Sequence, residues 1–196
     1  MSMDIFEIEK HLSKKLSNHR YIHTMGVKYT CICLAMKYGC DLNKAELAGL
    51  LHDCAKNYSA EKLVKTCKKN RIEMTDIEKK SPYLLHGKVG ALLAEKKYGV
   101  EDEDILNAIR FHTTGRPNMT LLEKIVFAAD YIEPGRNHAP NLTELRRLCF
   151  ENLDEAVYRI LKQTLDYLRE KKSNIDNHTV ETYDFYKNLR GRTDDE

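Results

Sequence analysis

The chain has 196 residues, enough for one domain of ordinary size with a substantial hydrophobic core. Hydrophobic residues make up 42% of it and charged residues 32%, a composition that excludes a disordered chain and is typical of a globular protein with charged helix faces. Its 32 basic and 30 acidic residues are interspersed and leave a formal net charge of +2, which gives no reason to expect a nucleic-acid polymer as a partner.

The N-terminus and the cysteines both favour a cytoplasmic protein. The first residues lack a basic segment followed by an apolar one, and no stretch approaches the ~18 apolar residues of a membrane span, so we expect no membrane association. The six cysteines lie mostly inside apolar helical patterns and are expected to be reduced. Cys31 and Cys33 would point to different sides of a helix, which excludes a CxxC redox pair.

Apolar spacing predicts an almost wholly helical chain, because four prolines and nine glycines leave few breaks and no run alternates with period two. In the first half we expect a helix capped by Asp41 or Asn43 that carries His52 and Asp53, and a loop with a short helix over 71–81. The other helices expected there are Asp4–Leu16, His19–Tyr38 ended by Gly39, and Ala60–Asn70 after Ser59.

The second half continues the pattern, with a polar loop after Arg136. A helix after Pro82 should run through His86 to Tyr98 and stop at Gly99. The remaining predicted helices are Glu103–His112, a very apolar one from Thr120 to Ile132, Leu153–Lys172 and Thr179–Leu189. We expect one all-α domain over residues 1–190 and a frayed tail over 191–196.

One stretch, AELAGLLHDCAK over residues 45–56, places His52 and Asp53 in an apolar helical run. Burying an unpaired carboxylate is costly, and the usual remedies are a metal ion or a hydrogen-bonded cation. For this pair alone, a buried histidine with one backbone bond and an aspartate that caps a nearby segment explain the pattern equally well.

Other polar residues also interrupt apolar helical patterns. They are His23, His86, His112 and Asp130, and Asp130 lies near a helix C-terminus, where the helix dipole disfavours an anion unless a cation compensates. Facing helices that each supply an inward ligand build a metal site in a bundle core. Mixed imidazole and carboxylate ligands suit iron, manganese or zinc, and the lack of thiolates argues against a structural zinc site.

The order His23, His52-Asp53, Asp130 resembles the H…HD…D signature of the HD-domain metal-dependent phosphohydrolases, an all-helical superfamily. Within it, the chain resembles the YqeK family of symmetrical diadenosine tetraphosphate hydrolases. The similarity runs from about residue 16 to 136. The blocks that carry it are HRYIHT at 19–24, LHDCAK at 51–56, HG at 86–87 with VGA at 89–91, IRFHTTG at 109–115 and ADYIEPGR at 129–136.

This resemblance implies an HD-type bundle with the metal site in its core, which cleaves diadenosine tetraphosphate into two ADP molecules. It implies iron as the metal, with manganese or zinc as alternatives and one or two ions, and it is compatible with a homodimer. The metal ligands would be His23, His52, Asp53 and Asp130. His86 and His112 would line the site, as ligands to a second metal or as phosphate contacts, and Thr113 would contact the substrate.

The chemistry of such a site can be stated without the family. A metal held by two imidazoles and two carboxylates lowers the pKa of water and polarises a phosphoryl oxygen. We expect His52 and Asp53 to be the catalytic pair, with Asp53 orienting or deprotonating the water. Lys56, Arg20 and Arg136 are the expected phosphate contacts, and Arg116 is a weaker candidate.

Two other functions fit the same residues. The chain could be an HD phosphohydrolase that acts on another nucleotide, such as a deoxynucleoside triphosphate or a cyclic dinucleotide. It could also be a sensor that binds metal and nucleotide without turnover, for which a dinucleoside polyphosphate or a nucleoside diphosphate would be the ligand.

Overall fold

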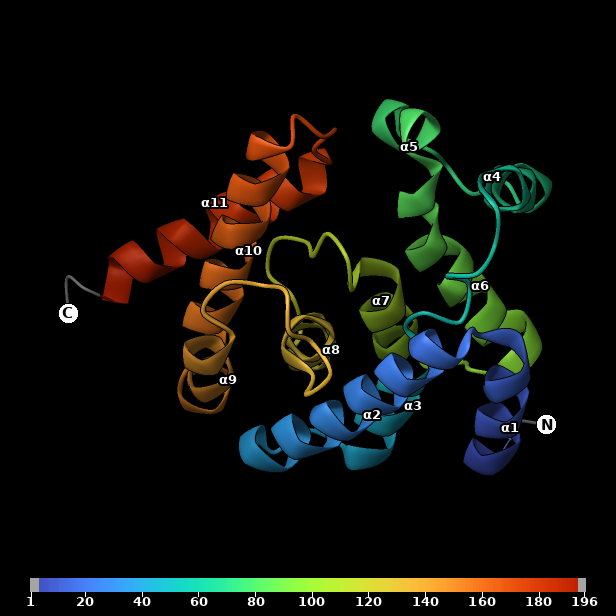
Figure 1. The fold of residues 1–196 in the computed structure, drawn as a ribbon, viewed down its shortest axis with the longest axis horizontal. Helices are drawn as coiled ribbons and strands as arrows, with labels where there is room; N and C mark the ends of the chain where they lie inside the picture. The colour runs from blue at the N-terminus through green and yellow to red at the C-terminus, as the bar shows by residue number, and fades with distance from the viewer. Residues whose placement is uncertain (1–3, 194–196) are drawn as a thin grey trace.

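The computed structural model describes residues 4–193, and within that range it contains helices and no strand (Figure 1). The predicted all-α fold is therefore confirmed. The elements are α1 (Ile5–Lys15), α2 (Asn18–Tyr38), α3 (Leu42–Leu51), α4 (Ala60–Lys69), α5 (Asp76–Lys80), the 3₁₀ helix η1 (Pro82–Leu85), α6 (His86–Tyr98), α7 (Glu103–Phe111), α8 (Leu121–Ile132), α9 (Leu142–Glu151), α10 (Leu153–Glu170) and α11 (Asn177–Thr193).

Side-chain caps explain where several helices begin. Ser17 accepts a hydrogen bond from the N–H of Arg20 at the start of α2, and Asp41 does the same for Lys44 at the start of α3. Thr120 and Glu123 form a reciprocal capping box on α8. Gly39 ends α2 with a φ of 71°, a left-handed conformation that favours glycine.

The main hydrophobic core contains residues from α1 to α11, and a second, smaller cluster of Ala55, Leu63, Cys67, Leu85 and Val89 joins α4, η1 and α6. Helix α8 contacts α2, α3, α7 and α10, and its Ile125 and Val126 are fully buried. Helices α2 and α3 pack closely because Gly49 has no side chain: a Cβ there would lie 2.9 Å from the Cys31 Sγ. Helices α2, α3, α7 and α8 therefore pack against one another in one region of the molecule.

The HD-bearing helix ends earlier than predicted. Helix α3 stops at Leu51, and the backbone from His52 to Asn57 forms consecutive turns in which the N–H of Cys54 bonds to the Leu51 carbonyl and that of Lys56 to the Asp53 carbonyl. From these turns both side chains reach one region, with His52 Nε2 3.5 Å from Asp53 Oδ2.

The polar loop predicted after Arg136 contains a helix that we did not expect. Helix α9 buries Leu142, Leu145, Leu148 and Cys149 against the neighbouring helices. Those residues recur at helical spacing, but the segment starts at Asn141, which is in the left-handed region and makes no side-chain cap bond. The sequence does carry a start pattern, Asn141 with Glu144 three residues later, but the side-chain cap bond that this pattern predicts does not form.

The far end of the chain is helical to Thr193, beyond the predicted Leu189. The frayed tail expected over 191–196 stays a prediction, because residues 194–196 lie outside the described part of the chain. Among the described residues, none of the helices combines the length and the apolar character that crossing a bilayer would require.

Candidate metal centre

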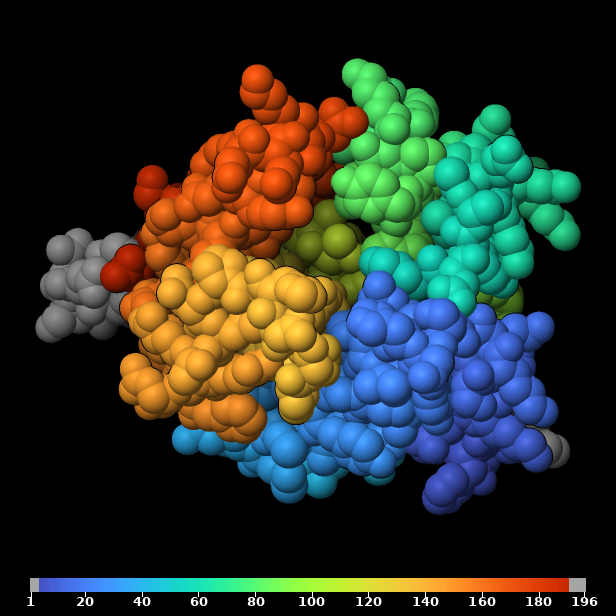
Figure 2. Space-filling view, viewed as in Figure 1, coloured from blue at the N-terminus to red at the C-terminus, as the bar shows by residue number. Residues whose placement is uncertain are grey.

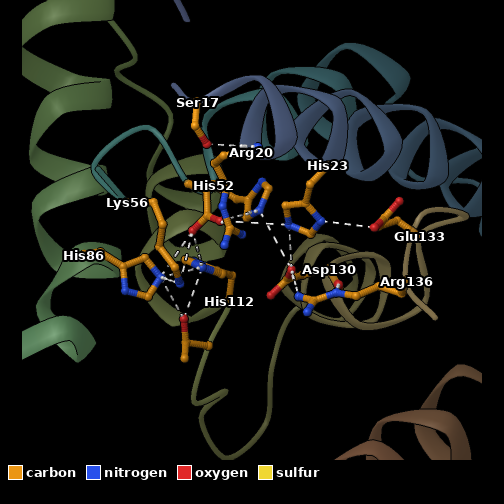
Figure 3. A network of polar contacts seen from close by, with 12 residues as sticks. Ser17, Arg20, His23, His52, Lys56, His86, His112, Asp130, Glu133 and Arg136 are labelled. Carbon is orange, nitrogen blue, oxygen red and sulfur yellow. Dashed lines mark hydrogen bonds and ion pairs between the residues drawn. The ribbon is translucent and has the colours of Figure 1, made fainter. Parts of the chain in front are cut away.

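Six histidine and aspartate side chains from distant segments converge in the region where α2, α6, α7 and α8 meet (Figure 3). His23 comes from α2, Asp130 from the last turn of α8, and His86 is the first residue of α6; the turns after α3 and α7 supply His52, Asp53 and His112. The surface is hollowed where the blue, teal, green, olive and orange segments approach one another (Figure 2). The structure thus brings together all the ligands expected from the sequence.

The first cluster consists of His23, His52 and Asp130. The Nε2 atom of His23 lies 3.1 Å from Asp130 Oδ1, and that of His52 lies 3.9 Å from the same oxygen. Asp53 Oδ2 approaches both rings, at 3.5 Å from His52 Nε2 and 3.9 Å from His23 Nε2. The four residues of the H…HD…D pattern therefore surround one point.

The second cluster consists of Asp53, His86 and His112. Asp53 Oδ1 lies 3.3 Å from His86 Nε2 and 3.5 Å from His112 Nε2. Because its other oxygen faces the first cluster, the Asp53 carboxylate lies between the two. Both Asp53 oxygens therefore face imidazole nitrogens.

The protonation of all four imidazoles follows from their Nδ1 partners. His52, His86 and His112 direct Nδ1 at the backbone carbonyls of Gly49, Tyr83 and Ile109, at 2.7, 2.6 and 2.7 Å. A carbonyl only accepts, so each Nδ1 carries a proton, and in the neutral form of each ring the lone pair is on Nε2. Burial alone would lower the pKa of His23, but its hydrogen bonds with Asp130 and Glu133 raise it. Its Nδ1 points at the Glu133 carboxylate, at 3.1 Å, so a neutral His23 also carries its proton on Nδ1. This is the tautomer that ligates a metal through Nε2.

These lone pairs fit a bound cation. The Nε2 atoms of His86 and His112 lie 3.0 Å apart, and two lone pairs facing each other at that distance repel unless a positive charge or a proton lies between them. The Nε2 atoms of His23 and His52 and the Oδ1 of Asp53 are buried without a hydrogen-bond partner among the described residues. Orphaned buried acceptors of this kind are costly, and a metal ion removes the cost.

The electrostatics hold the ligands in their metal-binding forms. Burial alone would raise the pKa of Asp53 and Asp130, but the surrounding imidazoles, and Arg136 beside Asp130, hold the pKa of both carboxyls well below the usual range. Burial lowers the pKa of His86 to about 4, and the nearby Lys56 ammonium adds to this effect against the opposing Asp53 carboxylate. At neutral pH the carboxylates are ionised and His86 is neutral, as metal binding requires.

Partly exposed polar side chains surround the clusters. Arg20 Nη1 donates to Asp53 Oδ2 at 2.8 Å, and Arg136 Nη2 donates to Asp130 Oδ1 at 2.8 Å. Lys56 Nζ lies 3.0 Å from His86 Nε2, and the hydroxyl of Thr113 lies 3.2 Å from the same atom. The main candidates for phosphate contact, Arg20, Lys56, Thr113 and Arg136, therefore all lie at the site. The Arg136 pair supplies the cation that Asp130 requires near a helix C-terminus.

Arg116, the weaker candidate, lies elsewhere. Its Nε donates to Glu123 at 2.8 Å, and its guanidinium lies over the Phe111 ring. Since Glu123 also closes the α8 capping box, this arginine supports a helix start and not the metal clusters.

Two residues that reach the site indirectly were not identified from the sequence. Glu133 is buried and accepts hydrogen bonds from His23 Nδ1 and from the N–H of Gly135, at 3.1 and 2.6 Å. Arg146 on α9 donates to the carbonyls of Ile132 and Arg136, at 2.9 and 2.7 Å, and so fixes the loop that carries Glu133. Glu133 could have been found from its place three residues after Asp130, whereas Arg146 belongs to the helix that the sequence did not predict.

Comparisons with known proteins agree with the geometry. The model of the HD domain family matches residues 20–135. The symmetrical bis(5'-nucleosyl)-tetraphosphatase of Bacillus subtilis (strain 168) is 41% identical over 174 residues, which cover 89% of this chain and 92% of that protein. The protein of the same name from Halalkalibacterium halodurans is 45% identical over 168 residues, or 86% and 89% of the two chains.

A solved structure also superposes closely. It is the crystal structure of a predicted HD superfamily hydrolase involved in NAD metabolism, from Clostridium acetobutylicum. It is 41% identical, with a TM-score of 0.94 over 96% of this chain and all of that one.

The fold and the six-residue site define an HD-domain protein, and the chain belongs to that family. Within the family it groups with the symmetrical bis(5'-nucleosyl)-tetraphosphatases, which match it over nearly their whole length. The resemblance read from the H…HD…D order and its flanking blocks is confirmed.

Proposed function

We propose that this protein is a metal-dependent hydrolase that cleaves diadenosine tetraphosphate symmetrically into two ADP molecules. The observation that carries the proposal is the convergence of four Nε2 lone pairs and two ionised carboxylates, in a chain that matches enzymes named for this activity over nearly their whole length. The named relatives favour this substrate over the other nucleotides. We also infer that the protein acts in the cytoplasm.

The residues fit two divalent ions, one in each cluster, with the Asp53 carboxylate between them. The first would be held by His23, His52 and Asp130, and the second by His86 and His112. Ions bound there supply Lewis acidity: they lower the pKa of water and polarise a phosphoryl oxygen. Iron is the metal we propose, because imidazole and carboxylate donors without thiolate suit it, and manganese and zinc are the alternatives.

Charge balance supports the need for bound cations. Around the clusters, the cationic Arg20, Lys56 and Arg136 are matched in number by the anionic Asp53, Asp130 and Glu133. The side chains alone therefore give little net attraction for a polyphosphate. Divalent ions would make the site strongly positive, as binding a tetraphosphate requires.

We assign the surrounding side chains to the phosphate chain. Arg136 beside Asp130 and Arg20 beside Asp53 offer planar forks of N–H donors, and Lys56, a third exposed, can move from His86 to a phosphate oxygen. The Thr113 hydroxyl can donate to another. These contacts would hold the central anhydride so that water adds to one inner phosphorus while the bridging oxygen leaves with the second ADP.

Within this proposal, His52 and Asp53 are the residues on which turnover depends. Both oxygens of Asp53 face imidazoles or Arg20, and its pKa is well below the usual range, so it orients the reacting groups and is a weak base. In the first cluster, the metal-ligating atom nearest to Asp53 Oδ2 is the Nε2 of His52, at 3.5 Å.

The first test is the variant pair His52→Ala and Asp53→Ala. Each should lose at least one bound metal equivalent by elemental analysis and lower kcat/KM for diadenosine tetraphosphate by more than about 100-fold, with the helical circular dichroism retained. Asp154→Asn, on the exposed start of α10, is the matched control and should leave both unchanged. Full activity of either site variant would refute the assignment.

Product analysis tests the substrate. Diadenosine tetraphosphate should give ADP as the sole nucleotide product with the metal-loaded protein. Faster turnover of a deoxynucleoside triphosphate or a cyclic dinucleotide would identify another HD hydrolase. Tight binding of diadenosine tetraphosphate without cleavage by the fully metal-loaded protein would identify a sensor.

A further inference from the structure

The surface carries a groove between α4 and α6, apart from the metal centre. It has a volume of about 650 Å³ and is lined by one face of α4 and by the second half of α6. None of the described residues that line it belongs to the metal clusters. Figure 1 shows α4 at the edge of the molecule, beside α6. The groove is therefore a separate feature, which the proposed hydrolysis does not use.

Lysines dominate the charge of this groove. Lys62, Lys65 and Lys69 come from α4 and Lys96 from α6, and among the described lining residues the one carboxylate is that of Glu61. The three α4 lysines form no ion pair with a described carboxylate, whereas Lys96 pairs with its chain neighbour at 2.7 Å. The whole chain has 32 basic and 30 acidic residues, so this excess is a property of the groove and not of the composition.

The positive charge continues past the groove at the end of α6. Lys97 Nζ donates to His11 Nε2 at 2.8 Å, and His11 Nδ1 faces the Tyr98 hydroxyl at 3.0 Å. An imidazole that accepts from an ammonium group is neutral, so it leaves the charge of Lys97 uncompensated. Burial lowers the pKa of Lys97, and the ammonium groups of Lys15 and Lys62 lower it further. A surface of this kind attracts carboxylates and repels cations.

Two leucines give the same groove an apolar part. Leu92 and Leu93 are adjacent on α6 and half-buried. The lysines at 62, 65 and 69 are three and four residues apart, so they form a row of roughly 10 Å along one side of α4. An occupant must therefore present aliphatic side chains and, beside them, a row of negative charges of similar length. A helix with leucines on one face and acidic residues at i, i+3 and i+7 next to it has this arrangement.

Nucleic acids and small anions fit the groove less well. Single-stranded nucleic acids bind through bases that stack on aromatic rings, and none of the described residues lining the groove is aromatic. A small phosphate anion would gain nothing from the two leucines. A peptide with both acidic and aliphatic side chains uses the charged and the apolar parts together.

We propose that the α4–α6 groove is the docking site for an acidic amphipathic helix of a partner protein. The aliphatic side chains of that helix pack on Leu92 and Leu93, and its carboxylates pair with Lys62, Lys65 and Lys69. The lysines are exposed, so salt screens these pairs and each contributes little. We therefore expect reversible binding that weakens as the ionic strength rises.

Fluorescence anisotropy of a labelled synthetic peptide tests the proposal with the full-length protein. The peptide is a 15-residue helix former with leucines at i, i+4 and i+7 and glutamates on the flanking positions. Its control has the same composition in scrambled order. The helical peptide should bind saturably and at least tenfold more tightly than the scrambled one. Equal binding of the two peptides, or no binding at 200 μM protein, would overturn the proposal.

Two neighbouring lysines provide a matched pair of variants. Lys68 and Lys69 both lie in the last turn of α4, but Lys69 lines the groove and Lys68 does not. Lys69→Glu should weaken binding of the helical peptide at least fivefold, because it places like charges together, whereas Lys68→Glu should change it less than twofold. Circular dichroism melts would confirm that both variants fold. Equal effects of the two substitutions would place the peptide elsewhere.

Leu92→Gln distinguishes a docked helix from simple charge attraction. It removes apolar contact and leaves every charge in place, so affinity for the helical peptide should fall at least threefold. An unchanged affinity would mean that the lysines attract any anion, and the proposal would be wrong. A labelled oligothymidylate that binds as tightly as the helical peptide, and that is weakened equally by Lys69→Glu, would identify a nucleic-acid site and would also overturn it.

Discussion

The four site histidines are held in one tautomer by oxygen acceptors on Nδ1, but one of these acceptors differs from the rest. Three are backbone carbonyls, which no side-chain substitution removes, and the fourth is the Glu133 carboxylate. Glu133 reaches His23 only because residue 26 of α2 is glycine. A Cβ at that position would overlap the Glu133 carboxylate. His23 is therefore the ligand whose orientation can be changed by mutation.

Glu133→Gln should weaken metal binding. The neutral amide retains an acceptor for Nδ1 but loses the charge that makes the imidazole a better donor, and the loss of such partners typically costs 10- to 100-fold in metal affinity. Gly26→Ala should act in the same direction by displacing the carboxylate. Metal affinity measured by competition with a chromophoric chelator checks both. Glu123→Gln, in an equally buried glutamate away from the site, should lower stability without changing metal affinity.

His86 makes the metal-free protein sensitive to acid. Its pKa is about 4 in the folded chain and near 6.5 when unfolded, so between these values the unfolded chain takes up a proton that the folded one does not. Stability should fall as the pH drops from 6.5 to about 4, by about 3 kcal/mol from this residue alone. Urea unfolding in chelator at pH 7 and pH 5 should show a smaller loss for His86→Gln. An equal loss in the variant would contradict the assignment.

The identity of the ligands could be read from the sequence, but their arrangement could not. His23, His52, His86 and His112 each interrupt an apolar pattern, and such a pattern can be recognised in the sequence alone. The division into two clusters depends on Asp53 lying between them, which follows from turns that a helical pattern conceals. The backbone carbonyls that fix the tautomer of three histidines could not be predicted from the sequence, because their position depends on the fold.

At the scale of elements, turns and short loops position more of the site than helix faces do. His52, Asp53 and Lys56 lie in the turns after α3, His112 follows α7, and Arg136 lies in the loop after α8. The helices form a rigid scaffold, and several of the ligands lie in the turns that follow the helix ends. Apolar periodicity predicted the frame well because it reports burial, and it predicted the loops poorly because their geometry depends on backbone bonds.

Helix α9 was not predicted although its apolar residues have helical spacing. Its start, Asn141, makes no side-chain cap bond in the structure. With α9 unrecognised, Arg146 could not be connected to the loop after α8. Tertiary packing against α10 and α8 stabilises this helix, and such packing is not visible in local sequence.

Arg146→Ala should loosen the loop over 133–136 while leaving the helices intact. Its guanidinium donates to four carbonyls of that loop and its flank, those of Ile132, Glu133, Pro134 and Arg136, at 2.9, 3.0, 3.5 and 2.7 Å. The loss should cost about 1–3 kcal/mol and raise KM more than it lowers kcat, because Arg136 would no longer be held at the site. Arg147→Ala, at the next position, loses only an exposed pair with Glu151 and should change neither.

At the scale of the whole molecule, the ligands join segments that are distant in sequence. His23 lies in the second helix and Asp130 in the eighth, and Asp53 stands between the two clusters. An ion bound to this set therefore connects most of the helical frame. Because the orphaned acceptors form only in the folded state, the free energy of metal binding adds to the free energy of folding.

Metal removal should therefore lower the stability of the whole domain and not of one loop. Free metal at 100 times its dissociation constant adds about 2.7 kcal/mol, which for a chain of this size corresponds to a Tm increase of roughly 5–10 °C. Calorimetry of chelator-treated protein, repeated as metal is added back, should show one transition that shifts upward until two equivalents are bound. His52→Ala should abolish most of the shift. A shift that saturates at one equivalent would mean that the second cluster binds no ion and that His86 and His112 contact phosphate instead.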